Sequence, residues 1–314
     1  MNTCGGLSRR EMLGSMAAMG AAVALGARPC VAAESQAAAG WRIGCFTRPF
    51  VDLEYRAAFD AVAEAGYKYV GFMTVKASGG TGKRKGGSEY IITPETSVED
   101  AAKAGEEAKK RGLGVLAAWG GGLPAVQKSV EAGVASLKRL IDNAEAAGVP
   151  TLLMGGTGEK TYDAYYRAIK ECCEYAAEKH VALVIKPHGG LNANGEQCRK
   201  TIEKVGNKNF RVWYDPGNIF FYSDGKLDPV DDAEKVAGIV TGMCVKDFKP
   251  PKDVNVTPGE GKVNFPKVME VLKRGGFNGG PLVVETIGPA EGLAGKIAEA
   301  RKARELVERL VGKA

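Results

Sequence analysis

The amino-acid sequence predicts a single-domain α/β fold, a (β/α)8 barrel, and three observations support this prediction. Eight short apolar runs recur along residues 40–314, and such runs are typical of parallel strands that are buried on both faces. Segments with helical periodicity separate these runs. Eight strand–helix units in about 270 residues match the usual size of a (β/α)8 barrel. The strand candidates are Trp41–Phe46, Tyr69–Thr74, Leu113–Trp119, Thr151–Met154, Val181–Ile185, Arg211–Tyr214, Val240–Val245 and Leu282–Val284.

The helical pattern is clearest between the third and the fourth strand candidates, where the apolar residues Val134, Leu137, Ile141 and Ala144 recur at helical spacing. Gly148 and Pro150 are expected to end this helix before the next strand begins. A second helix is expected from about residue 266 to residue 273, with Pro266 near its start. A doubly wound open sheet is the alternative fold, but no Gly-x-Gly-x-x-Gly pattern follows the first strand candidate.

Residues 1–39 are expected to be a signal peptide with a short linker, and residues 40–314 to be the barrel. Arg9 and Arg10 form a twin-arginine pattern, which a weakly apolar stretch and a small-residue cleavage site at residues 31–33 follow. The alternative is a chance pair of arginines before an Ala-rich helix. The apolar stretch is too short to span a bilayer permanently, so no stable membrane association is expected after cleavage. The pattern predicts twin-arginine export to the periplasm or the extracellular space.

Composition narrows the function classes. The chain is 45% hydrophobic and 25% charged, as expected of a globular protein, and its formal net charge of +6 is spread along the sequence. No Lys/Arg run is interleaved with aromatic residues, so nucleic-acid binding has no support. Of the seven cysteines, two leave with the signal peptide, and the odd remainder argues against a disulfide scaffold. The sequence leaves open whether one disulfide bridge forms and whether the chain assembles into a homo-oligomer.

Polar residues follow the last four strand candidates at similar spacing. Lys186 and His188 follow the fifth, Asp215 the sixth, Lys246 the seventh and Glu285 the eighth. The carboxyl ends of barrel strands converge on one mouth, where enzymes of this fold place their chemistry. Carboxylates and an imidazole at one mouth predict a site for Mn²⁺, Mg²⁺ or Zn²⁺. The alternative is an ion-pair network without metal, in which the lysines neutralise Asp215, Asp247 and Glu285.

These strand ends, together with the segments Pro258–Phe265 and Gly276–Gly279, resemble the xylose-isomerase-like TIM barrels. That family includes sugar isomerases, ketose epimerases and inosose dehydratases, and the resemblance covers roughly residues 40–310. It implies a (β/α)8 TIM barrel with a divalent metal that Glu, Asp, His and Glu hold at the ends of strands five to eight. A nuclease of the endonuclease IV type shares the fold but uses many His ligands, which two histidines do not provide.

Carried over position by position, the resemblance leaves two of the four metal ligands altered. Asp215 matches the Asp and Glu285 the last Glu, whereas the first Glu falls on Lys186 and the His on Cys244. A lysine ammonium repels a metal ion, while a Cys244 thiolate would favour Zn²⁺. His188 is expected to supply the missing nitrogen. The metal candidates are therefore His188, Asp215, Cys244 and Glu285.

The resemblance implies an enzyme that acts on a small carbohydrate or polyol by proton transfer next to a carbonyl. Glu285 is the expected base, Lys186 the second acid–base group or the stabiliser of an enolate oxygen, and His188 a further catalytic candidate. Since only one of two acid–base carboxylates remains, a lyase or dehydratase acting on an oxidised sugar is an alternative. A non-catalytic sugar-binding barrel with a decayed metal site is another. Substrate contacts are expected from Arg48, Trp119, Lys246 and Glu260.

Overall fold

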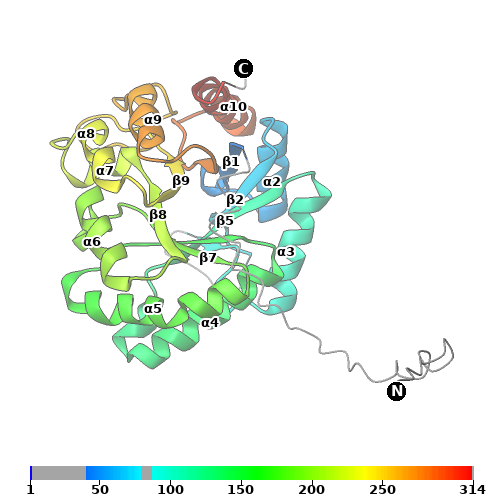
Figure 1. Cartoon of the computed structure of the whole chain (residues 1–314). Helices are drawn as coiled ribbons and strands as arrows, with labels where there is room; N and C mark the ends of the chain where they lie inside the picture. The colour runs from blue at the N-terminus through cyan, green and yellow to red at the C-terminus, as the bar shows by residue number, and fades with distance from the viewer. Residues whose placement is uncertain (2–39, 79–86, 313–314) are drawn as a thin grey trace. The chain divides into compact units, whose positions relative to one another are not determined.

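The computed structural model describes Met1, residues 40–78 and residues 87–312. Its strands close into a parallel barrel in the order β1-β10-β9-β8-β7-β6-β5-β2, which confirms the predicted fold class (Figure 1). The prediction of a signal peptide concerns residues 2–39, which lie outside the described residues, and stays a prediction. The barrel strands are β1 Arg42–Phe46, β2 Tyr69–Phe72, β5 Gly114–Gly121, β6 Thr151–Met154, β7 Ala182–Ile185, β8 Phe210–Tyr214, β9 Val240–Val245 and β10 Pro281–Val284.

All eight predicted strands lie in the barrel, but the second is shorter than expected. The barrel strand β2 ends at Phe72, and the chain then forms a separate antiparallel pair, β3 (Thr74–Lys76) with β4 (Ser88–Tyr90). The physical reason lies at Met73. Its backbone N–H donates to the side-chain oxygen of Thr47 at 3.1 Å, and its carbonyl accepts from the N–H of Ile91 at 3.3 Å. Neither group is then available to a neighbouring barrel strand.

Helices surround the strands, and both helices predicted from sequence are present (Figure 1). The first spans Val130–Ala146, where the side chain of Ser129 accepts a hydrogen bond from the backbone N–H of Ala132 and so caps the helix. The second spans Phe265–Arg274 and is capped in the same way by Asn264. The helices are α2 Tyr55–Glu64, α3 Val98–Lys110, α4 Val130–Ala146, α5 Tyr162–Glu178, α6 Gly195–Val205, α7 Pro216–Tyr222, α8 Pro229–Ala233, α9 Phe265–Arg274 and α10 Gly292–Leu310.

Short 3-10 helices complete the connections, and the one that follows β1, Arg48–Phe50, begins with a residue of the barrel mouth. The other 3-10 segments are Pro124–Gln127, Glu159–Thr161, Gly190–Asn192 and Glu234–Val236. Within the part of the chain that the structure describes, none of the helices has the length and the apolar character needed to cross a bilayer.

The buried apolar side chains form two clusters, because successive residues of a strand point to opposite faces. One cluster fills the barrel interior and the other packs between the strands and the helices. On β8, for example, Trp213 belongs to the interior cluster, whereas Val212 and Tyr214 belong to the outer one. The interior cluster consists of Phe46, Met73, Leu116, Ala117, Leu153, Val184, Trp213, Cys244 and Val283. This alternation decides which residues reach the mouth of the barrel.

Candidate active site

Each polar residue of the barrel mouth stands two positions after a residue of the interior cluster. Val184 precedes Lys186 in this way, Trp213 precedes Asp215, Cys244 precedes Lys246, and Val283 precedes Glu285. Because side chains two positions apart share a face, the four polar groups form the next layer above the apolar interior. The four are 0–2% exposed. Arg48, two positions after Phe46 and at the start of the 3-10 helix that follows β1, joins them with a side chain that is 36% exposed.

The five charged groups of this layer form one ion-pair cluster. The Nζ atom of Lys186 lies 3.0 Å from Oδ2 of Asp215 and also pairs with Glu285. The Nζ atom of Lys246 lies 3.2 Å from Oδ2 of Asp215 and 2.8 Å from Oε1 of Glu285. Arg48 donates from Nη1 to the same Oε1 at 2.8 Å. Three cationic groups therefore face two carboxylates, and the cluster carries one net positive charge.

The protonation states follow from the burial and the charges around each group. Burial opposes the charged form of Glu285, but Lys186, Lys246 and Arg48 outweigh it and hold the pKa of Glu285 well below its ordinary value. Burial likewise opposes the ammonium of Lys186, but the negative charge around it raises its pKa above the ordinary value. Burial also raises the pKa of the Cys244 thiol well above its ordinary value. At neutral pH Glu285 and Lys186 are therefore charged, and the Cys244 thiol is not.

Asp215 and Lys246 are held in place by the start of α7. Asp215 caps this helix, because its Oδ1 accepts from the backbone N–H of Asn218 at 3.0 Å, while its other oxygen faces the lysines. Asn218 accepts from Nζ of Lys246 at 3.2 Å and donates to the carbonyl of Pro187 at 2.6 Å. Asn218 was not singled out from the sequence. The cap pattern Asp215-Pro-Gly-Asn218, which directs Asn218 back toward the strand ends, is the signal that could have found it.

His188 lies beside the cluster and packs against aromatic rings. Its ring centre is 5.1 Å from that of Trp119 and 5.7 Å from that of Tyr222. Nζ of Lys186 lies 5.5 Å from the centre of the Trp119 ring. Burial and the nearby charges of Lys186 and Lys246 lower the pKa of His188 to about 3, so the imidazole is neutral. Among the described residues, His188 does not belong to the group of side chains close enough to share a metal ion.

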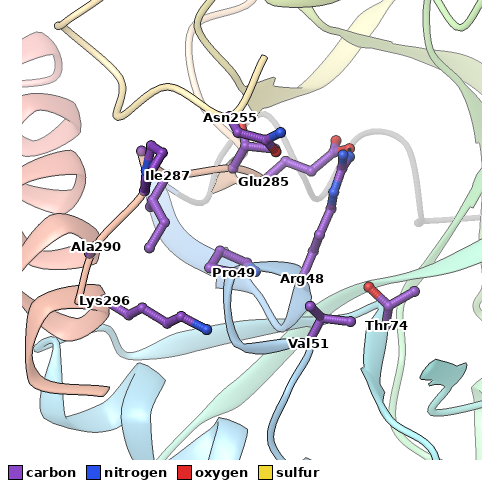
Figure 2. A pocket seen from close by; sticks show the side chains of 12 residues that line it. Arg48, Pro49, Val51, Thr74, Asn255, Glu285, Ile287, Ala290 and Lys296 are labelled. Carbon is purple, nitrogen blue, oxygen red and sulfur yellow. Dashed lines mark hydrogen bonds and ion pairs between the residues drawn. The ribbon is translucent and has the colours of Figure 1, made fainter. Parts of the chain in front are cut away.

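Two cavities open beside the cluster and share Arg48, Thr74 and Glu285 as lining residues. The smaller, of about 240 Å³, is also lined by Trp119 and His188. The larger, of about 520 Å³, extends toward Asn255 and Lys296. Figure 2 shows the side chains of Arg48 and Glu285 meeting at their tips beside this larger cavity. Four of the residues predicted to act at the site, namely Arg48, Trp119, His188 and Glu285, thus border one space.

Glu260 lies apart from this space. Its side chain is 48% exposed, and Oε1 lies 3.8 Å from Nζ of Lys302. The reason is the neighbouring Asp247, whose carboxylate accepts hydrogen bonds from the backbone N–H groups of Gly259, Gly261 and Val263 at 2.9–3.0 Å. These bonds draw the backbone of the loop inward, and the Glu260 side chain points to solvent. Asp247 therefore holds the loop, whereas Lys246, the residue before it, belongs to the charged cluster.

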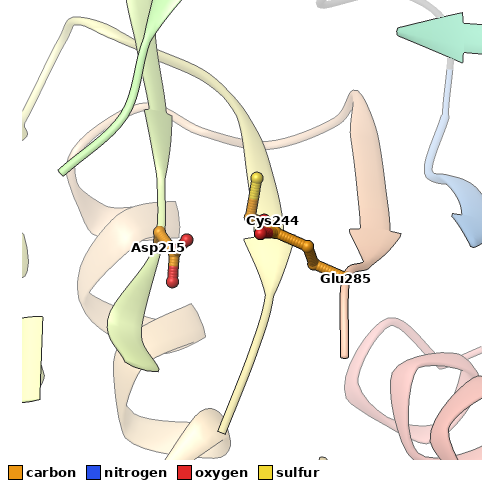
Figure 3. Close-up of side chains that lie close together, drawn as sticks. All are labelled: Asp215, Cys244 and Glu285. Atoms are coloured by element: carbon orange, nitrogen blue, oxygen red, sulfur yellow. The ribbon is translucent and has the colours of Figure 1, made fainter. Parts of the chain in front are cut away.

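Three of the four predicted metal ligands come together. The ligand atoms of Asp215, Cys244 and Glu285, from three neighbouring strands, lie within 4.8 Å of one another (Figure 3). These residues as they stand do not fit a divalent ion. The carboxylate oxygens already contact two ammonium groups and a guanidinium, and the Cys244 thiol is protonated. A divalent cation would add two positive charges to a cluster that already has one in excess, and like charges repel.

Comparisons with known proteins agree with the fold. The sequence profile of the family described as "Xylose isomerase-like TIM barrel" matches residues 59–310. The L-ribulose-5-phosphate 3-epimerase UlaE of Escherichia coli O17:K52:H18 (strain UMN026 / ExPEC) is 27% identical over 183 residues, which cover 54% of this chain and 61% of that protein. The match thus spans less than two thirds of the length of this curated relative.

Solved structures are similar in fold. A D-psicose 3-epimerase determined in the presence of D-fructose superposes with a TM-score of 0.66 at 15% identity, covering 87% of this chain and 100% of that one. A xylose isomerase domain protein from Planctomyces limnophilus superposes with a TM-score of 0.64 at 20% identity, covering 88% and 100%. At these identities the likeness concerns the fold alone. Since the family profile matches most of the sequence, the chain belongs to the xylose isomerase-like TIM barrel family.

Proposed function

We propose that this chain is an enzyme of the isomerase or epimerase type, which acts on a small carbohydrate or polyol by proton transfer next to a carbonyl. The observation that carries the proposal is the excess of positive charge in the buried cluster around Asp215 and Glu285. Removal of a proton next to a carbonyl creates an enolate, which bears one negative charge. Preorganised cations that face the developing charge stabilise such an intermediate.

Glu285 is the proposed base, since it is the carboxylate of the cluster that borders both cavities. Without substrate, three cations depress its pKa, and a carboxylate of low pKa is a weak base. A substrate oxygen that accepts a hydrogen bond from Arg48, which lines both cavities, would withdraw this guanidinium from Glu285. The pKa of Glu285 would then rise toward the working pH. Lys186, whose raised pKa makes its ammonium a weak acid, would hold the enolate oxygen.

The smaller cavity suits a ligand of monosaccharide size. Its volume of about 240 Å³ lies below the range of about 300–1,000 Å³ that is typical for drug-sized ligands. The Trp119 ring offers an apolar face for a sugar, and the neutral imidazole of His188 offers one donor and one acceptor for hydroxyl groups. The curated relative is named for the epimerisation of a sugar phosphate, which supports a sugar substrate.

A lyase or dehydratase reaction on an oxidised sugar is the second candidate. The observation that favours it is the single carboxylate at the cavities: Lys186 stands where the family resemblance calls for a second acid–base glutamate. Epimerisation removes a proton from one face of a carbon and returns it to the other, which requires two groups. Elimination requires one base, and the leaving group departs from the substrate itself; Glu285 would take the proton, and the Lys186 ammonium would stabilise the negative charge that develops.

Hydrogen–deuterium exchange tests the proposal. The purified protein is incubated in D₂O with a panel of ketoses, aldoses and keto-sugars, and deuterium at the carbon next to the carbonyl is measured by NMR. We expect exchange with at least one sugar, and a loss of about 10²–10⁴-fold in its rate for Glu285→Gln. The matched control is Glu260→Gln, which removes an exposed carboxylate away from the cavities and should keep the rate.

The products separate the candidates. Exchange with inversion at that carbon supports the epimerase, exchange with carbonyl migration supports an isomerase, and loss of a substituent supports the lyase. Ligand binding seen as a thermal shift, without exchange for any bound sugar, would indicate a non-catalytic binding barrel and contradict the proposal.

A further inference from the structure

We infer that the ammonium group of Lys186, together with that of Lys246, takes the position in which a divalent metal would bridge Asp215 and Glu285. The chain thus provides its own cation at the barrel mouth. The inference starts from the disagreement between the residues present and the metal that the family resemblance implies.

Both ammonium groups bridge the same two carboxylates. Lys186 contacts Oδ2 of Asp215 at 3.0 Å and pairs with Oε2 of Glu285. Lys246 contacts the same Oδ2 at 3.2 Å and the other oxygen of Glu285, Oε1, at 2.8 Å. A cation placed between two carboxylates, here from the ends of β8 and β10 on either side of β9, is the arrangement that a bridging metal would have. Here the bridge is made by hydrogen bonds from N–H groups that belong to the chain.

Neither ammonium can leave this position easily. Lys186 is fully buried and Lys246 is 2% exposed, so neither ammonium group is hydrated by bulk solvent. Lys246 is also held by Oδ1 of Asn218 at 3.2 Å, and Lys186 lies over the Trp119 ring. A metal ion would have to displace these groups and leave buried positive charges without partners, which is costly.

The charge balance indicates that the residue at position 186 decides whether a divalent ion can bind between the carboxylates. With Lys186, three cationic groups face two carboxylates, and a divalent ion would strengthen the excess of positive charge. With a glutamate at position 186, two cationic groups would face three carboxylates. A divalent ion would then restore the single net positive charge that the cluster carries now. We therefore expect Lys186→Glu to create a metal site that the natural chain lacks.

The experiment titrates chelator-treated, purified protein with Mn²⁺, by isothermal calorimetry and by the electron paramagnetic resonance signal of free Mn²⁺. For the natural chain we expect no stoichiometric binding and no change of the melting temperature with Mn²⁺ or chelator. For Lys186→Glu we expect one bound equivalent, with an affinity at least on the order of tenfold above that of the natural chain. Lys186→Met, which removes the ammonium without adding a ligand, is the matched control and should bind more weakly than Lys186→Glu.

Two results would overturn the inference. One is a stoichiometric Mn²⁺ site in the natural chain that Asp215→Asn abolishes. This result can be obtained even if the Lys186 variants do not fold. The other is a Lys186→Glu protein that is folded by circular dichroism but binds Mn²⁺ no better than the natural chain. The role of the ammonium groups at an enolate rests on the proposed function. Metal titration does not measure turnover, so a failure here is distinguishable from a failure of the deuterium-exchange test.

Discussion

Lys186 and Lys246 place their Nζ atoms 3.0 Å and 3.2 Å from one and the same oxygen, Oδ2 of Asp215. Two ammonium groups this close repel each other, and the carboxylate between them compensates for that repulsion. Asp215 is therefore as important for the charge balance of the barrel mouth as for the cap of α7. The two roles can be separated, because Asn caps a helix about as well as Asp but carries no charge.

Asp215→Asn is expected to destabilise the protein although it retains a capping residue. Removing one partner of a buried pair typically costs about 3–5 kcal/mol, because the other partner is left buried and uncompensated. Urea unfolding followed by circular dichroism measures the change in the free energy of unfolding. The control is Asp163→Asn, whose exposed side chain pairs with Lys204 and should contribute less than about 1 kcal/mol. Equal losses in both variants would contradict the buried role of Asp215.

His188 is expected to make stability fall as the pH drops below about 6.5. Its pKa is about 3 in the folded chain and 6.5 in the reference state, so between these values the unfolded chain binds the extra proton. Acid then favours unfolding, by up to about 1.4 kcal/mol for each pH unit. Unfolding curves at several values from pH 6.5 to 5, where few carboxylates titrate, should show this slope.

The His188→Gln variant should lose that slope while it retains the other acid-labile interactions. The control variant is His180→Gln, which removes the exposed histidine that follows α5 and reports on general effects of such a replacement. A slope of unchanged size in His188→Gln would rule out the neutral, buried imidazole as its source.

Trp119 is expected to contribute to ligand binding more than to the chemical step. Its ring borders the smaller cavity and contacts His188. Trp119→Ala should raise KM for a sugar that undergoes deuterium exchange on the order of tenfold, which corresponds to about 1.4 kcal/mol of lost binding, with a smaller effect on kcat. Trp119→Phe retains an aromatic face and should lose less. If kcat falls and KM does not change, the ring acts on the reaction itself.

The barrel could be predicted from the sequence because its strands are buried on both faces and therefore appear as uninterrupted apolar runs. The β3–β4 pair could not, because β4 has three residues, Ser88–Tyr90, without an apolar pattern. Where Tyr69–Thr74 leaves the barrel depends on a hydrogen bond between Met73 and Thr47, which are far apart in the sequence. Such contacts between distant residues leave no periodic signal.

The convergence of Lys186, Asp215 and Glu285 was predictable, since strand ends of a parallel barrel meet at one mouth. Alternation along β9 likewise places Lys246 in this layer, one level above Cys244, and the sequence offered Lys246 both as a substrate contact and, in the ion-pair alternative, as a partner of the carboxylates. Glu260 was expected near the substrate because its loop follows the seventh strand. The backbone N–H groups of that loop donate hydrogen bonds to the Asp247 carboxylate, and the Glu260 side chain therefore points outward. Such tertiary contacts are not encoded in the spacing of residues along the sequence.

The positive charge between Asp215 and Glu285 is part of the polypeptide. Every folded molecule carries this charge, because the lysines that bear it are built in at translation. A site built in this way needs no loading step and has no apo form. Neither the ion content of the surrounding compartment nor a competing metal-binding protein sets its occupancy. The cost is adaptability, because a tethered ammonium can be neither exchanged for a stronger Lewis acid nor withdrawn as a means of control.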